Sequence, residues 1–204
     1  MKFKNKYFVS FEGPEASGKT SQIKLLSKVL KRKKIPFIIT REPGGTKIAE
    51  KLRKIILDKN ISITSTEEIL LLMAARLNHI NNVIKPALKA GKLVISDRFA
   101  DSSFVYQGYV NKFGLNKALN MHCELLDNFL PNKTFLFLIP SKIINNRLKK
   151  RKISNKYDKI NIKFHQKVIR GYSLLSKNNK RFIKINATKS IDEINKIILN
   201  ELSL

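Results

Sequence analysis

The sequence predicts an α/β fold, in which a five-stranded parallel sheet is doubly wound and carries helices on both faces. Five short runs are almost continuously apolar, as expected of strands covered on both sides. Longer amphipathic segments separate these runs, which is the alternation that such sheets require. No internal repeat or low-complexity linker divides the chain, so we expect one domain over residues 1–204.

The expected strands are short and rich in β-branched and aromatic residues. They are Tyr7–Glu12, Phe37–Thr40, Leu93–Ser96, Thr134–Ile139 and Phe182–Ile185. Right-handed crossovers between parallel strands bring their carboxyl ends to one edge of the sheet. A ligand site is expected at that edge.

The expected helices show apolar residues at spacings of three and four. In Lys19–Lys33 these residues are Ile23, Leu26 and Leu30. Thr66–Ala90 is predicted as one long helix with a capped start at Thr66-Glu67-Glu68-Ile69. The remaining helices are Lys47–Leu57, Leu115–Leu130, Ser141–Lys150, Ile162–Ser176 and Ile191–Leu199.

The chain is strongly basic, with a formal net charge of +26. Such a charge can attract nucleic acid or steer anionic substrates. The excess is mostly lysine, spread along the whole length together with many Ile and Asn residues. Aromatic residues are not interleaved with the basic runs, as a stacking platform for single strands would require. We interpret the bias chiefly as the codon composition of an A/T-rich genome, and expect no nucleic-acid partner.

The composition favours a cytoplasmic protein without a membrane partner. The start, MKFKNKYFVSFEG, lacks the apolar core and small-residue cleavage site of a secretory leader. No run reaches the ~18 apolar residues of a membrane span. Cys123 is the only cysteine, so it can form no internal disulfide, and we expect it to be buried.

A glycine-rich loop between the first strand and the first helix predicts ATP binding. Gly13–Thr20, GPEASGKT, fits the spacing G-x4-G-K-[ST] in the strand–helix context that this motif needs. Its backbone N–H groups and the helix N-terminus can cradle phosphates. Lys19 can reach the β and γ phosphates, and the Thr20 hydroxyl can ligate Mg²⁺. The expected ATP-binding residues of this loop are Gly13, Pro14, Glu15, Ala16, Ser17, Gly18, Lys19 and Thr20.

A second candidate site follows the third expected strand. Asp97 stands at its carboxyl end, where a carboxylate can hold Mg²⁺ through water beside a triphosphate. Arg98 follows directly and can bridge phosphates. An aspartate in this position can also simply cap a turn, so the pair gains weight only beside the phosphate-binding loop.

Further blocks of sequence carry a family resemblance. From Lys6 to about Asn195, the chain resembles bacterial thymidylate kinases, which are P-loop nucleoside-monophosphate kinases. The blocks are FEGPEASGKT at 11–20, TREPGGT at 40–46, AAR at 74–76, DRF at 97–99 and SSFVYQG at 102–108. The resemblance implies transfer of the γ-phosphoryl of ATP-Mg to dTMP, giving dTDP and ADP for dTTP synthesis. It also implies a homodimer, for which 47–57 and 70–88 offer apolar faces.

The resemblance also implies roles for individual residues. Arg41 would hold the dTMP phosphate, Glu15 would contact the deoxyribose 3'-hydroxyl, and Arg76 would donate to thymine O4. Arg98 and Lys19 would act in catalysis. The remaining dTMP-binding residues would be Leu72, Ser103, Tyr106 and Gln107.

The chain departs from the family pattern at three places. Leu72 replaces a phenylalanine that stacks on thymine, which predicts weaker dTMP binding or looser base choice. Leu138 stands where an aspartate is usual. Ala16 leaves the phosphate loop without an arginine, so a mobile lid at about 149–163 should supply the catalytic cation.

Within and beside that lid, Arg147 would stack on adenine and Arg151 would stabilise the transferring phosphoryl. Asn155-Lys156 replaces the usual Asp-Arg pair, which leaves open which lid cation acts.

No general base is expected, because the acceptor phosphate is already largely dianionic at neutral pH. The three histidines, His79, His122 and His165, lie outside the motifs. Three other functions stay open at this point. The first is a kinase for another nucleoside or deoxynucleoside monophosphate, or for a deoxynucleoside. The second is a P-loop ATPase that binds nucleic acid, and the third is a non-catalytic scaffold, which the altered lid suggests.

Overall fold

The computed structural model describes residues 7–149 and 162–204. Its core is a five-stranded sheet with the order β2-β3-β1-β4-β5, in which every neighbouring pair is parallel. The strands are β1 (Phe8–Glu12), β2 (Phe37–Arg41), β3 (Leu93–Asp97), β4 (Lys133–Leu138) and β5 (Phe182–Asn186). The predicted fold class and all five predicted strands are confirmed, within one residue at their ends.

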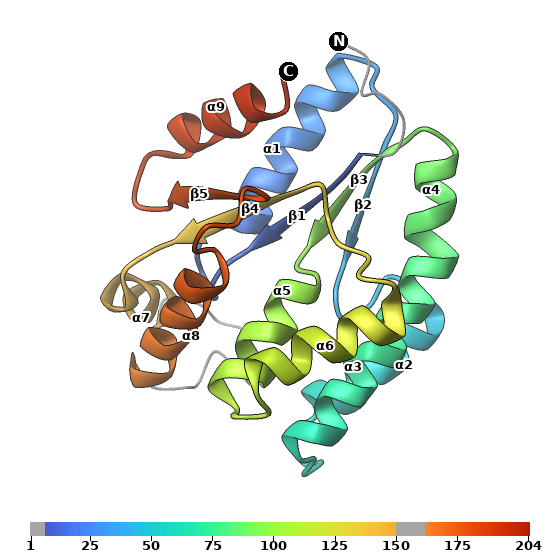
Figure 1. Ribbon diagram of the computed structural model, residues 1–204. Coiled ribbons are helices and arrows are strands. Elements are labelled where there is room, and N and C mark those ends of the chain that lie inside the picture. Colours follow the sequence, from blue (N-terminus) through green and yellow to red (C-terminus); the bar gives the residue numbers. More distant parts are fainter. Residues whose placement is uncertain (1–6, 150–161) are drawn as a thin grey trace.

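Helical segments fill most of the chain between the strands (Figure 1). They are α1 (Lys19–Arg32), α2 (Lys47–Leu57), α3 (Ser65–His79), η1 (Ile80–Ile84), α4 (Lys85–Lys89), α5 (Ala100–Ser103), η2 (Phe104–Val110), α6 (Leu115–Leu126), α7 (Ser141–Lys149), α8 (Ile162–Leu175) and α9 (Ile191–Glu201).

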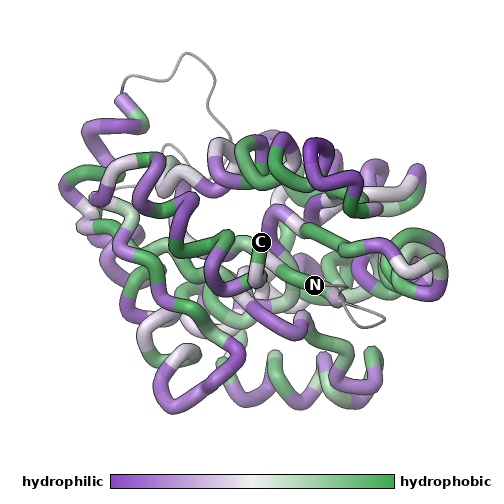
Figure 2. The backbone as a smooth tube through the Cα atoms, turned by 90° about the horizontal axis from the view of Figure 1, so that it is seen from above, coloured by the Kyte–Doolittle hydropathy of each residue, from purple (hydrophilic) through white to green (hydrophobic). Residues whose placement is uncertain are grey.

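Two apolar layers cover the two faces of the sheet. On one face, Leu26 of α1 and Ile198 of α9 pack with Phe11 and its neighbours. On the other face, Met73 of α3 packs in the cluster around Phe8. Figure 2 shows the helices alternating between hydrophobic and hydrophilic stretches, as expected of elements with one buried side. The side chains at the carboxyl ends of the strands are therefore held on a rigid base.

The predicted long helix differs from the observed one at its start and in its middle. It begins at Ser65 rather than Thr66, because Thr64 caps it and exchanges hydrogen bonds with Glu67 in a capping box. Its regular pattern widens at η1, where the Lys85 N–H donates to the Ile80 carbonyl. Pro86 follows and has no N–H to donate, so it interrupts the helical bonding there.

One helical stretch was not predicted at all. Residues 100–110 form α5 and η2, which carry Ser103, Tyr106 and Gln107 into the site. Phe104, Val105 and these three residues are all buried, so the segment has no polar stripe from which its periodicity could be recognised.

The expectation for Cys123 was wrong. It lies exposed on α6, whereas its neighbour His122 faces the core.

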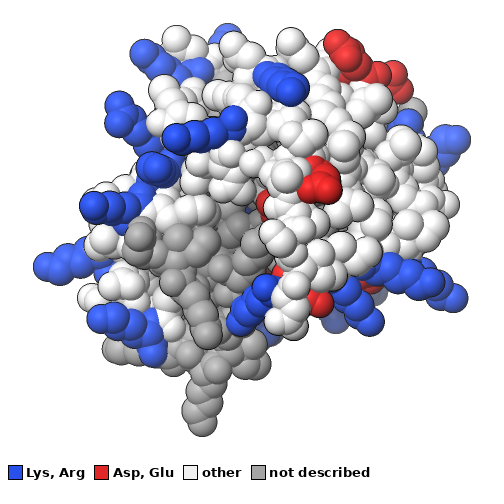
Figure 3. All heavy atoms as spheres, turned by 90° about the horizontal axis from the view of Figure 1, so that it is seen from below, with Lys and Arg blue, Asp and Glu red and all other residues white. Residues whose placement is uncertain are grey.

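Basic side chains are distributed around the rim of the face in Figure 3, and they do not gather into one patch there. No helix in the two described ranges has the length and apolar character needed to cross a membrane.

Candidate nucleotide-binding site

The loop between β1 and α1 has the backbone shape that its glycines predict. Gly13 has φ +132°, and a Cβ there would lie 2.4 Å from the Phe137 carbonyl oxygen. Gly18 has φ +97° and stands at the N-cap of α1. Residues 15–20 line one broad cleft. These positions need glycine because a side chain would be strained or would collide with β4.

Lys19 lies folded back over this loop. Its Nζ donates to the carbonyl oxygens of Gly13 at 3.0 Å and Pro14 at 2.8 Å. Burial, with a smaller contribution from Arg98, lowers the pKa of Lys19 to about 8. A phosphate in the cleft would add an opposite charge and raise that pKa again, so binding of the anion and protonation of Lys19 favour each other.

Thr20 and Asp97 meet at the predicted magnesium position. The Thr20 hydroxyl donates to Asp97 Oδ2 at 3.0 Å, and both residues line the cleft. A hydroxyl and one carboxylate suit Mg²⁺, which usually keeps several waters and phosphate oxygens as its other ligands. The described residues contain no group of three or more His, Cys, Asp or Glu side chains that could hold a metal by themselves. The donor set therefore fits an ion that arrives with nucleotide phosphates.

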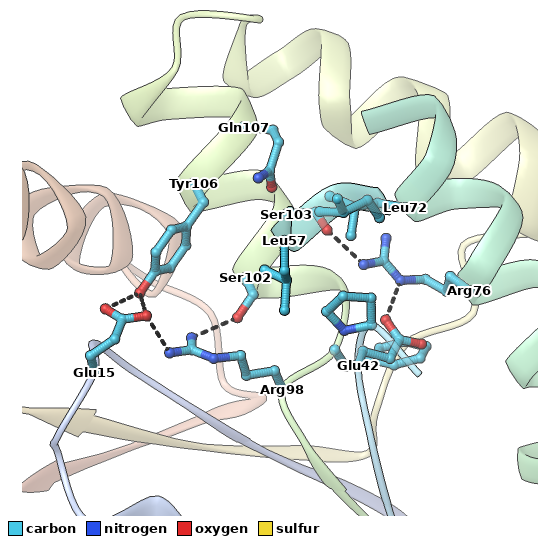
Figure 4. Close-up of a pocket in the computed structure, with 13 residues that line it drawn as sticks. Glu15, Glu42, Leu57, Leu72, Arg76, Arg98, Ser102, Ser103, Tyr106 and Gln107 are labelled. Atoms are coloured by element: carbon cyan, nitrogen blue, oxygen red, sulfur yellow. Dashed lines mark hydrogen bonds and ion pairs between the residues drawn. The ribbon is translucent and has the colours of Figure 1, made fainter. Parts of the chain in front are cut away.

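Arg98 occupies the centre of the site in a left-handed backbone conformation, with φ +68°. Its guanidinium donates to the Gly13 carbonyl at 3.0 Å and to Glu15 Oε1 at 2.9 Å. Burial alone would raise the pKa of Glu15, but Arg98, Lys19 and the Tyr106 hydroxyl together lower it. Glu15 is thus held as an anion between Arg98 and Tyr106 (Figure 4).

Glu12 lies beneath Arg98 and is fully buried. It accepts hydrogen bonds from the Phe99 N–H at 2.7 Å, the Ser102 hydroxyl at 2.7 Å and the Tyr172 hydroxyl at 2.9 Å. Burial and the nearby Asp101 raise the pKa of Glu12 to about 7. Ser102 and Tyr172 also accept from Arg98, so this buried carboxyl supports the arginine from below.

A second cavity adjoins the cleft and is roofed by α3 and η2. In Figure 4, Glu15, Tyr106 and Arg98 gather on one side of it, and Arg76, Glu42 and Leu72 on the other. The predicted dTMP-binding residues Glu15, Leu72, Arg76, Arg98, Ser103, Tyr106 and Gln107 all line this cavity.

Arg76 is the most deeply buried of these residues. It is 1% exposed, and its Nε donates to Glu42 Oε2 at 2.7 Å. Its Nη2 donates to the Ser103 hydroxyl at 2.6 Å. Glu42 remains ionised, because Arg76 and His79 lower its pKa against the effect of burial. The arginine is therefore fixed before any ligand arrives.

Arg41 stands at the carboxyl end of β2, beside the phosphate loop, as expected. It lines the cleft, but its guanidinium forms an exposed ion pair with Glu50 at 3.0 Å. Arg53, which the sequence reasoning missed, lines the same cleft and donates to the Pro43 carbonyl at 2.8 Å. Burial and the neighbouring Arg41 lower the pKa of Arg53. Its signal in the sequence was its position twelve residues after Arg41, on the first helix that follows the TREPGGT block.

Of the two arginines expected in or beside the lid, the structure describes only one. Arg147 lies at the other end of the phosphate loop, where it donates to the Ala16 carbonyl at 3.1 Å. It lines a third hollow together with Ser17, Gly18 and Ile191. Arg151, with most of the lid and the Asn155-Lys156 pair, lies outside the described residues.

Two histidines also reach the site, although none was assigned a place in a motif. His79 Nδ1 lies 3.0 Å from Glu42 Oε1, and His165 Nδ1 lies 4.0 Å from Glu15 Oε2. The spacing of three residues between Arg76 and His79 on a helix places both on one face, and this signal could have revealed the first contact.

Comparisons with known proteins agree with this geometry. A family profile described as Thymidylate kinase matches residues 11–198. A thymidylate kinase of Lactobacillus acidophilus is 41% identical over 201 residues, covering 96% of this chain and 93% of the relative. That of Orientia tsutsugamushi is 42% identical (95% and 91% covered), and that of Staphylococcus epidermidis is 40% identical (92% of each covered). The chain belongs to the thymidylate kinase family.

Proposed function

We propose that the chain transfers the γ-phosphoryl of ATP-Mg to dTMP, giving dTDP and ADP. Its family makes it a nucleoside-monophosphate phosphotransferase of the dTMP kinase type. One observation carries the assignment of the two substrates. The cleft over the phosphate loop and the cavity under α3 share Glu15, Glu42 and Arg98, so two nucleotides can lie with their phosphates facing each other.

The donor would lie along the phosphate loop. Backbone N–H groups of residues 15–20, which include the start of α1, would bind its phosphates, with Lys19 turning from the loop carbonyls to the β and γ phosphates. Arg147 lies beside the loop, where its planar guanidinium could stack on the adenine ring. Thr20 and Asp97 would hold Mg²⁺, Asp97 through water, and the ion would neutralise charge on the β and γ oxygens.

The acceptor would enter the second cavity with its base towards Arg76. Arg76 and Ser103 would donate to the carbonyl edge of thymine, and the buried Gln107 would complete the polar contacts. Leu72 would pack against the ring. The opposite end of the cavity, where Glu15 and Tyr106 meet, suits the sugar and its 3'-hydroxyl.

The acceptor phosphate would then lie near the arginines of the cleft. Arg98 already stands between the two cavities, and Arg53 lines the cleft beside it. Arg41 would join them by exchanging Glu50 for phosphate oxygens, which a planar guanidinium binds with two donors.

The chemical step would rely on position and charge rather than on proton abstraction. The dianionic acceptor phosphate is itself the nucleophile. Lys19 and Arg98 would neutralise charge on the transferring group, which is the main contribution of protein groups in phosphoryl transfer. We propose Arg151, in the lid at about 149–163, as the third catalytic cation. Closure of the lid would exclude water and prevent wasteful ATP hydrolysis.

We further propose that the protein acts as a homodimer in the cytoplasm. Four large apolar side chains stay exposed on two packed helices, Ile48 and Ile55 of α2 and Leu70 and Leu77 of α3. Within each helix the pair is seven residues apart and so shares one face. Leu70→Glu should convert a dimer into a monomer in sedimentation velocity, and an unchanged sedimentation coefficient would contradict this interface.

The test of the reaction is ADP formation from ATP-Mg with dTMP, dUMP, dGMP and dAMP compared side by side. We expect the highest kcat/KM with dTMP and slow ADP release without an acceptor. A better purine acceptor would instead indicate a kinase for another monophosphate. ATP hydrolysis that DNA or RNA stimulates in the absence of an acceptor would indicate a nucleic-acid-dependent ATPase.

A further inference from the structure

A chain of hydrogen bonds runs behind Arg76, away from the cavity. Arg76 Nε donates to Glu42 Oε2 at 2.7 Å, and Glu42 Oε1 lies 3.0 Å from His79 Nδ1. The other ring nitrogen, His79 Nε2, lies 2.6 Å from Thr40 Oγ1. Glu42 and His79 are almost completely inaccessible to solvent. Buried polar groups in such a series hold one another in place, since an unpaired one would be costly.

One arrangement of protons satisfies all the hydrogen bonds among Arg76, Glu42, His79 and Thr40. In the neutral tautomer that carries its proton on Nδ1, His79 donates to Glu42 and accepts at Nε2 from the Thr40 hydroxyl. One carboxylate oxygen of Glu42 then serves His79, and the other serves Arg76. With one oxygen held by Arg76 and the other by the imidazole, the orientation of the carboxylate depends on both contacts.

The loop after β2 is packed against the same imidazole. A Cβ on Gly45 would lie 2.6 Å from both Cδ2 and Nε2 of His79. The loop backbone therefore rests directly on the ring, and Gly45 leaves the room for it. His79 thus links α3, which carries Arg76, to the loop that begins with Arg41 and Glu42.

We propose that Glu42 and His79 are positioning residues that set the choice of base by fixing Arg76. The proposal rests on the proposed function, in which Arg76 donates to a carbonyl at position 4 of the pyrimidine. Cytosine presents an amino donor at that position. A guanidinium that cannot turn away meets this donor with its own N–H groups, which disfavours dCMP. A loosened guanidinium would lose affinity for dTMP and part of this discrimination.

The test compares Glu42→Gln, His79→Leu, His79→Asn and Thr40→Val with the unaltered chain. For Glu42→Gln and His79→Leu, we expect KM for dTMP to rise roughly tenfold to a hundredfold, as when a buried charged group loses its partner. KM for ATP and kcat at saturating dTMP should stay within about twofold, and the preference for dTMP over dCMP should fall. Asparagine keeps a donor at the place of Nδ1, so His79→Asn should recover most of the dTMP affinity that leucine loses. Thr40→Val should show the smallest loss.

The matched control is Glu124→Gln, which makes the same chemical change on an exposed part of α6 and should alter none of these values. The melting temperature of each variant is recorded beside its kinetics. The proposal is overturned if folded variants keep the dTMP affinity and base preference of the unaltered chain. It is also overturned if KM for ATP and KM for dTMP rise together, since that pattern indicates general loosening of the fold.

The same data separate this inference from the proposed function. If the unaltered chain prefers another monophosphate to dTMP, its own kinetics contradict the proposed function, before any variant is considered. The variants then still report whether Glu42 and His79 set the affinity for whichever acceptor is preferred.

Discussion

The two arginines expected to bind the acceptor stand in contrasting surroundings. Arg76 is 1% exposed and paired with Glu42, which is also buried. Arg41 also pairs with a glutamate, Glu50, but the side chains of this pair are 56% and 38% exposed. Water screens the second pair and leaves it weak, whereas the first is held by its surroundings. We infer that the base pocket is assembled before the substrate arrives, while the phosphate end takes its final form upon binding.

Lys19 gives the sharpest test of this comparison, because it lies at the phosphate end and is nevertheless buried. Lys19→Ala should lower kcat on the order of 10³-fold or more, through loss of a positive charge at the transferring phosphoryl. The measurement is a coupled assay of ADP release. Circular dichroism should show an unchanged fold, since the Lys19 amine binds only the loop around it. Activity near the unaltered level would exclude the proposed catalytic role.

The difference between the two ion pairs can be measured directly as stability. Arg76→Met leaves the carboxylate of Glu42 buried without its cation, which should reduce the free energy of unfolding by about 4 kcal/mol. Arg41→Met breaks an exposed pair and should cost less than about 1 kcal/mol. Urea denaturation of both variants gives the comparison.

Arg41→Met, which should barely change stability, should nevertheless have a clear effect on the kinetics. Arg41→Met should raise KM for dTMP with little effect on KM for ATP. Equal losses of stability in the two variants would show that burial does not distinguish the two ends of the site.

Glu12 lies under Arg98, where the base pocket and the phosphate end join. Its raised pKa predicts how the stability of this part of the site depends on pH. Its folded-state pKa of about 7 lies above the ordinary 4.5, so between these values the folded chain holds a proton that the unfolded chain has released. The stabilisation from this proton is complete below pH 4.5 and is lost as pH rises through 7. The shift of 7 − 4.5 = 2.5 corresponds to about 3 kcal/mol.

Glu12→Gln cannot titrate, so the stability of the unaltered chain relative to this variant should fall by that amount between pH 4.5 and pH 8. Groups that do not interact with Glu12 contribute equally to both proteins and cancel in the difference. Urea midpoints measured across this pH range give the result. A pH-independent difference would show that Glu12 is ionised throughout, as an ordinary charged member of the Arg98 network.

The sequence predicted the parts of the site that depend on backbone shape and on short spacings. The phosphate loop follows from glycines that β4 and the helix start require, and Asp97 and Arg98 follow from the end of an apolar strand. The five strands were recognised because burial on both faces removes polar residues from them. Such signals are local, so one sequence is enough to read them.

The parts that sequence reasoning missed depend on contacts between distant segments. Glu42 and His79 are 37 positions apart, and only the fold brings them within hydrogen-bonding distance. The helical segment 100–110 was missed because most of its residues, polar and apolar alike, are buried. The pairing of Arg41 with Glu50 was missed because both residues were read separately, one as a ligand for phosphate and the other as part of a helix.

The affinity of the base pocket for dTMP should be improved by a change at Leu72, where this chain departs from the family pattern. Leu72 lines the cavity and is 6% exposed, so a phenylalanine there would place an aromatic ring beside the base. Offset stacking on thymine adds about 0.5–1.5 kcal/mol, so Leu72→Phe should lower KM for dTMP by roughly twofold to tenfold. KM for ATP should not change, and calorimetric titration with dTMP should show the same gain in affinity. A higher KM would mean that the larger ring fills space which the base needs, and that the pocket has been rebuilt around leucine rather than left short of an aromatic ring.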